Sequence, residues 1–142
     1  MDEILLEIVG TQKIDNQRDK MELTTVGTLE EQNDTYVIRY SEEQEPPTKP
    51  IRVCVKIDKN EKSVEMTRSG AFNSCLIIEK SKRNLCRYGT EFGDILMGIS
   101  GHTIEHEYAD KKGHFVFSYD IDINGALASR NEVKMTFRKN QE

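Results

Sequence analysis

The chain has 142 residues and a formal net charge of −5, with 20 lysines and arginines against 25 aspartates and glutamates. This length suits one domain, so we expect residues 1–142 to form a single domain that buries roughly two-thirds of the surface exposed by its unfolded chain. The modest acidic balance, without a basic stripe, argues against a nucleic-acid-binding surface, and no segment approaches the roughly 20 apolar residues of a membrane span.

Apolar and polar residues alternate with a period of two along most of the chain, which is the pattern of strands with one buried face. Connections are short, and the three prolines lie together in the polar loop 41–50. No helical pattern is longer than a turn. The predicted strands cover residues 3–12, 21–29, 36–40, 51–57, 64–68, 71–80, 85–90, 93–100, 102–108, 115–124 and 127–138.

Two hairpins allow a register to be predicted. A two-residue turn at Asn33-Asp34 sets Leu29 opposite Ile38 and Gly27 opposite Tyr40, so the apolar faces match. The long hairpin over 112–139 has one apolar and one charged face.

The fold class that follows is all-β, a single antiparallel meander barrel of about 8–10 strands. Consecutive strands joined by short connections are antiparallel, and so many strands in a small domain must curl into a barrel or split into two packed sheets. A barrel also removes exposed strand edges, which invite aggregation. We expect the first and last strands to pair and close it.

Two sequence motifs carry a family resemblance: Arg68-Ser69-Gly70, at the end of a strand, and Tyr88-Gly89-Thr90-Glu91-Phe92-Gly93. With Tyr119 following in order, the chain from Leu5 to Phe137 resembles the YwiB-like family of bacterial proteins of unknown function. The chain departs from the family pattern at Glu91, where proline is expected. The resemblance implies a lipocalin-like (calycin) barrel and no activity, since fold does not fix function.

The histidines do not predict a metal site. His102 and His106 are four residues apart on a strand, which separates them by roughly 13 Å at about 3.3 Å per residue, and His114 has the opposite parity. If Ala109 pairs with His114, His106 faces Phe117 and both His102 and His106 point into the barrel beside aromatic residues. The alternatives are that they lie idle at the barrel mouths, or that a bulge turns them outward.

Arg68 is the sharper candidate for a binding residue. Pairing Ile57 with Lys62 sets Val55 beside Val64 and places Arg68 on the apolar face. A guanidinium there needs a partner, because an unpaired buried charge costs several kcal/mol. Glu42 is one candidate partner, and a bound anion is the other, since arginine suits carboxylates and phosphates. The plainer interpretation is an internal ion pair that ties strands together.

The tyrosines on the barrel wall are either core residues with hydroxyls at the rim or ligand contacts. The candidate ligand-binding residues are Tyr40, Glu42, Arg68, Tyr88, His102, His106 and Tyr119.

No nucleophile elbow, glycine-rich phosphate loop or cofactor motif is present, so we expect no catalytic residues and no cofactor. Three cysteines without a CxxC pair argue against disulfides and zinc, and fit a reduced protein in the cytoplasm. The sequence favours a barrel that binds a small anionic or amphipathic ligand inside. The alternative is a filled barrel that acts as an interaction or structural module, for example as a homodimer. An enzyme using His and Arg groups ranks last.

Overall fold

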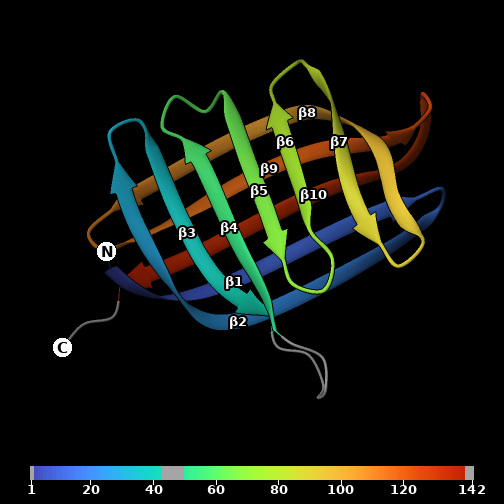
Figure 1. The fold of residues 1–142 in the computed structure, drawn as a ribbon. Helices are drawn as coiled ribbons and strands as arrows, with labels where there is room; N and C mark the ends of the chain where they lie inside the picture. The colour runs from blue at the N-terminus through green and yellow to red at the C-terminus, as the bar shows by residue number, and fades with distance from the viewer. Residues whose placement is uncertain (1, 43–49, 140–142) are drawn as a thin grey trace.

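The computed structural model describes residues 2–42 and 50–139, and all of its regular elements are strands. Figure 1 shows ten strands. They are β1 (Asp2–Ile14), β2 (Gln17–Gln32), β3 (Thr35–Glu42), β4 (Ile51–Asp58), β5 (Ser63–Ser69), β6 (Ser74–Glu79), β7 (Arg83–Thr90), β8 (Gly93–Ala109), β9 (Lys112–Ile123) and β10 (Ala126–Lys139).

The ten strands form a closed antiparallel barrel in which each strand pairs with its sequence neighbours. β1 pairs with β10 from Ile4 opposite Lys139 to Lys13 opposite Arg130, which confirms the predicted closure and the predicted fold class. Strands β3 to β7 run across one side of the barrel, and the longer strands β8, β9, β10, β1 and β2 cross behind them (Figure 1). No helix in the described part of the chain is long and apolar enough to cross a membrane.

One end of the barrel interior is filled by apolar side chains. Phe115, Phe117 and Phe137 are all at most 2% exposed, and Ile4 and Leu6 of β1 are fully buried beside them. Each of these residues lies at an inward-facing position of its strand, so the apolar residues of the alternating sequence pattern are the ones that fill the core. The other end is lined by tyrosines, an arginine and further apolar side chains.

The hairpin registers are partly as predicted. Leu29 lies opposite Ile38, and the turn at Asn33-Asp34 is confirmed. In the β4–β5 hairpin the predicted register is wrong by two residues, because Val55 lies opposite Met66 rather than Val64. The strands are joined by a longer connection between Asp58 and Ser63, and this lengthening keeps every side chain on its predicted face.

The seam between β6 and β7 is the thinnest part of the wall. Its ladder has one pair, Ser74 opposite Tyr88. Side chains replace further ladder bonds: the backbone N–H of Ile77 donates to Cys86 Sγ at 3.4 Å, and Asn84 Nδ2 donates to the carbonyl of Ile77 at 3.3 Å. The barrel is therefore closed there by side chains as much as by backbone.

Candidate functional site

A cavity of about 390 Å³ occupies the end of the barrel that the phenylalanines do not fill, and we call it the mouth cavity. Tyr40 of β3, Arg68 of β5, Tyr88 of β7 and Tyr119 of β9 all line it. Four of the seven candidate residues therefore converge from alternate strands on one space. The apolar part of the wall includes Ile8, Met66, Leu76, Met97, Ile121 and Val133.

Arg68 forms an ion pair with Glu42, which is one of the two partners that the sequence predicted for it. Arg68 Nη1 lies 3.0 Å from Glu42 Oε2, and the two side chains are 32% and 20% exposed. The second carboxylate oxygen, Glu42 Oε1, is buried and has no hydrogen-bond partner among the described residues. A guanidinium carries five N–H donors, so this one contact leaves Arg68 with donors for another anion.

Tyr40 and Tyr119 are neutral hydrogen-bonding groups in the mouth cavity. Burial, followed by the nearby Glu42 carboxylate, raises the pKa of Tyr40 to about 12, with Arg68 opposing the shift. Burial likewise raises the pKa of Tyr119, and Arg68 again opposes it. At neutral pH both phenols keep their protons, so they offer O–H donors beside the Arg68 cation. The lining of the cavity also includes the charged residues Asp19, Lys20 and Glu132.

Tyr88 and Arg68 also border a second space of about 400 Å³ under the connections that follow β5 and β7. Ile51, Phe72 and Ser74 line this second space with them. Tyr88 is 40% exposed, so it stands at the boundary between the mouth cavity and solvent.

The prediction that His102 points into the barrel is wrong. The β8–β9 register shifts between Gly101 and Ile104, and this bulge turns His102 to the outer face. There its Nε2 lies 2.9 Å from Asp120 Oδ2, and the side chain is 53% exposed.

His106 lies at the filled end, away from the mouth cavity. The predicted pairing with Phe117 is wrong, because the two-residue turn between Ala109 and Lys112 sets His106 opposite Phe115. Both the ring Nδ1 and the backbone N–H of His106 contact Glu61 Oε2, at 2.9 and 2.7 Å. Burial opposes ionisation of Glu61, but the hydrogen bonds from His106 outweigh it and lower the pKa of the Glu61 carboxyl. The Tyr36 ring lies 5.5 Å from the His106 ring.

Sequence reasoning missed the three methionines of the mouth cavity, Met21, Met66 and Met97, and the contact between Glu61 and His106. Met66 and Met97 have the inward parity of their strands, a signal that was available but unspecific. Glu61 lies in a turn with a backbone φ of 60°, and nothing in its sequence context indicates that it reaches His106.

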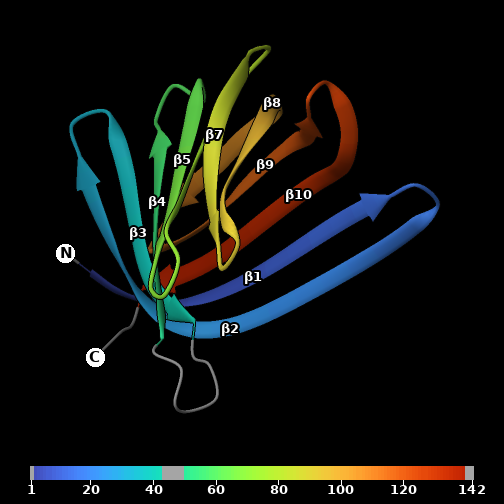
Figure 2. The same ribbon diagram turned by 45° about the vertical axis from the view of Figure 1, so that its right-hand side comes forward.

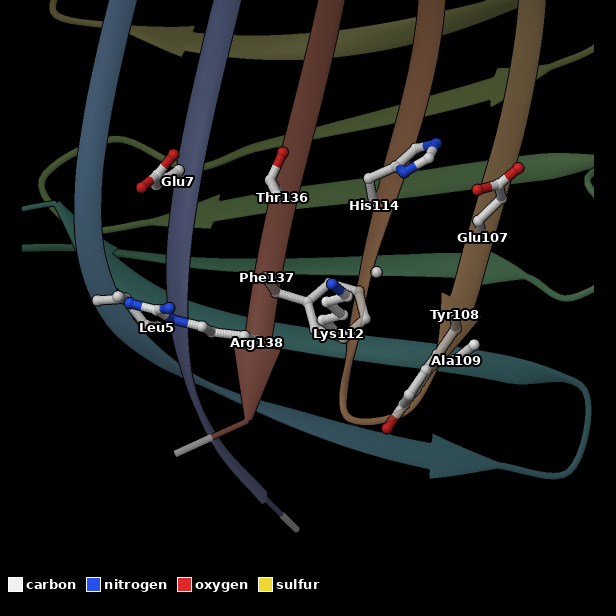
Figure 3. Close-up of a pocket in the computed structure, with 11 residues that line it drawn as sticks. Leu5, Glu7, Glu107, Tyr108, Ala109, Lys112, His114, Thr136, Phe137 and Arg138 are labelled. Atoms are coloured by element: carbon white, nitrogen blue, oxygen red, sulfur yellow. The ribbon is translucent and has the colours of Figure 1, made fainter. Parts of the chain in front are cut away.

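A further hollow of about 460 Å³ lies on the outer face of β8, β9, β10 and β1. Ladder pairing sets Glu7, Thr136, His114 and Glu107 in one row across these strands, and Figure 3 shows their side chains side by side rather than converging. No group of three metal-ligating side chains exists here or elsewhere in residues 2–42 and 50–139. The mouth cavity is the better candidate because its polar groups face one another.

Comparison with known proteins supports the fold and names no activity. The model of the family described as "Domain of unknown function (DUF1934)" matches residues 6–135. The crystal structure of the ywiB protein from Bacillus subtilis is similar to this one with a TM-score of 0.84 and 19% sequence identity, covering 99% of this chain and 93% of that chain. No curated protein is similar enough to count as a match.

Proposed function

The chain belongs to the DUF1934 family, whose activity is unknown, and on that premise we propose that it is a cytoplasmic binding protein that holds a small amphipathic anion in its mouth cavity. The observation that carries the proposal is the convergence of Arg68 with Tyr40, Tyr88 and Tyr119 on one space. A volume of about 390 Å³ falls within the range of small-molecule sites, roughly 300–1,000 Å³.

The chemistry of the wall favours a molecule with an anionic head and an apolar body. Arg68 supplies charge and directed N–H donors, which suit a carboxylate or a phosphate. The buried phenols of Tyr40 and Tyr119 add O–H donors, and the methionines Met66 and Met97 offer a polarisable, adaptable apolar surface.

Glu42 is not among the residues that line the mouth cavity, so its part in the proposed site is to hold the Arg68 guanidinium at 3.0 Å. The three free cysteines fit the reducing cytoplasm that the proposal assumes.

The test compares decanoate with decanol, which share a chain and differ in charge, by isothermal titration calorimetry. We expect the protein to bind decanoate at least about tenfold more tightly, because a hydrogen bond to a charged group contributes about 1.5–3 kcal/mol. Arg68→Met should remove this preference. Arg87→Met, which removes an exposed arginine on the outer face next to Tyr88, should leave it unchanged.

Native mass spectrometry of the untagged protein, purified gently from its own host, provides the second readout. A retained mass that disappears on denaturation would identify the class of the ligand. Equal affinity for decanoate and decanol would rule out an anion anchor at Arg68. Absence of binding to either probe, together with a bare native mass, would rule out the interior site.

A further inference from the structure

β2 has a free edge along most of its length. Its ladder with β1 runs from Gln17 to Leu29, but its ladder with β3 starts only at Thr28. Between Gln17 and Gly27, no strand of the described chain pairs with the side of β2 that faces away from β1. Figure 2 shows the β1–β2 hairpin extending away from strands β3 to β7.

β2 and β3 approach each other closely at Gly27, next to the end of their ladder at Thr28. A Cβ at this position would lie 2.6 Å from the carbonyl oxygen of Arg39 and 3.3 Å from Tyr40 Cβ, so the backbones approach closely here and then diverge. A groove of about 830 Å³ follows the edge from Leu23 to Thr28, and residues 17–22 are all exposed. Alternate residues of this edge therefore present unpaired N–H and C=O groups to solvent.

Charges along the edge restrict what can pair with it. Arg18, Lys20 and Glu22 lie on the outer face, and Asp19 lies on the inner face beside Met21. Lysines and inward-pointing charges on an edge discourage indiscriminate strand pairing. A partner strand must therefore place opposite charges against these side chains.

A second copy of β2 meets this requirement in one register. In antiparallel pairing about a two-fold axis, an axis at Lys20 or at Glu22 sets like charges directly opposite each other. An axis at Leu23 sets Lys20 opposite Val26 and leaves the charges unmatched. An axis at Met21 sets Lys20 opposite Glu22 twice, and each lysine already contacts the glutamate of its own chain at 2.9 Å. Four alternating charges would then form a square.

We propose that two copies of this chain associate through the free edges of β2, antiparallel, with Met21 at the two-fold axis. Met21 lines the mouth cavity and is 46% exposed, so the interface brings the two mouth cavities side by side on the inner face of a shared sheet. The association rests on the edge alone and is independent of whether the mouth cavity binds an anion.

The test is sedimentation equilibrium of the full chain from micromolar to millimolar concentration, with charge reversals at the interface. Lys20→Glu and Glu22→Lys each turn two attractive pairs into repulsive ones, and each should raise the dimer dissociation constant about tenfold or more. The double swap Lys20→Glu/Glu22→Lys restores opposite charges and should return the constant to within a few-fold of the original. Lys134→Glu, on the outer face of β10, which is paired on both sides, is the matched control.

Both interface side chains are more than 60% exposed, so the variants should fold, and far-UV circular dichroism checks this. A wild-type chain that stays monomeric at millimolar concentration would overturn the proposal and leave the edge to an extended segment of another protein. A dimer insensitive to the single reversals would place the interface elsewhere. Single reversals that weaken the dimer without recovery in the double swap would overturn the register.

Discussion

Neutralising Arg68 should reveal how far the barrel depends on its ion pair with Glu42. Arg68→Met leaves the Glu42 carboxylate without its guanidinium, with one oxygen already buried and unpaired in the described chain. Breaking a fully buried pair costs about 3–5 kcal/mol, and an exposed pair contributes about 0.2–1 kcal/mol. The Arg68 and Glu42 side chains are 32% and 20% exposed, so their pair lies between these two cases. We therefore expect Arg68→Met to lower the free energy of unfolding by about 1–3 kcal/mol.

The double variant Arg68→Met/Glu42→Gln removes both charges at similar volume and should recover about 1–2 kcal/mol of that loss. Urea unfolding followed by far-UV circular dichroism is the suitable assay, since the chain has no tryptophan. Each kcal/mol corresponds to a shift of about 2–4 °C in the midpoint of thermal unfolding for a chain close to this size. A single variant as stable as the double variant would refute the reasoning, because the lone carboxylate would then carry no penalty.

Four further substitutions test the packing and the contact between Glu61 and His106. Glu61→Ala removes both contacts to His106 and should cost about 1–3 kcal/mol at pH 7. Since the folded pKa of Glu61 is lowered, this contribution is present above its unfolded pKa and is lost as pH falls through the folded value, so urea unfolding at pH 7 and pH 3 should show the difference shrinking in acid. Phe137→Ala should cost about 3–5 kcal/mol, whereas Phe92→Ala, at a 92% exposed position, should change stability by less than about 0.5 kcal/mol. Gly101→Ala would press a Cβ into the last backbone carbonyl of β6 and should lower the melting temperature by several degrees, and an unchanged midpoint would show that β6 yields freely.

The alternation of residue types was sufficient to predict the barrel, because side-chain direction depends only on the parity of each residue along its strand. Parity also placed Arg68 on the inner face, although the predicted β4–β5 register was two residues off. A shift of two residues conserves the buried face, so the hydrophobic pattern cannot detect it. The length of the turn decides such a shift. Turn length depends on the backbone conformations of the turn residues, which the alternation of apolar and polar residues does not reveal.

His102 shows where the parity of a residue along its strand fails to predict the side of the barrel wall on which its side chain lies. One bulge between Gly101 and Ile104 reverses the side of the wall on which His102 lies. Gly101 is buried, with a β6 carbonyl where its Cβ would be, so the bulge is fixed by a contact with a strand distant in sequence. Tertiary contacts of this kind leave no periodic signal in the chain. The mouth cavity, by contrast, was predictable in part because its tyrosines and Arg68 lie on regular strands.

The pairing of β1 with β10 sets the order of events during synthesis. Ribosomes make the chain from its N-terminus at about 5–20 residues per second, and domains fold as they emerge. The hairpins from β2 to β9 can form as each second strand appears, but one edge of β1 has no partner until β10 is made. Ile4, Leu6 and Ile8 of β1 therefore stay incompletely covered until β10 is made, and a nascent chain stalled before Ala126 would present this strand to chaperones or to other nascent chains.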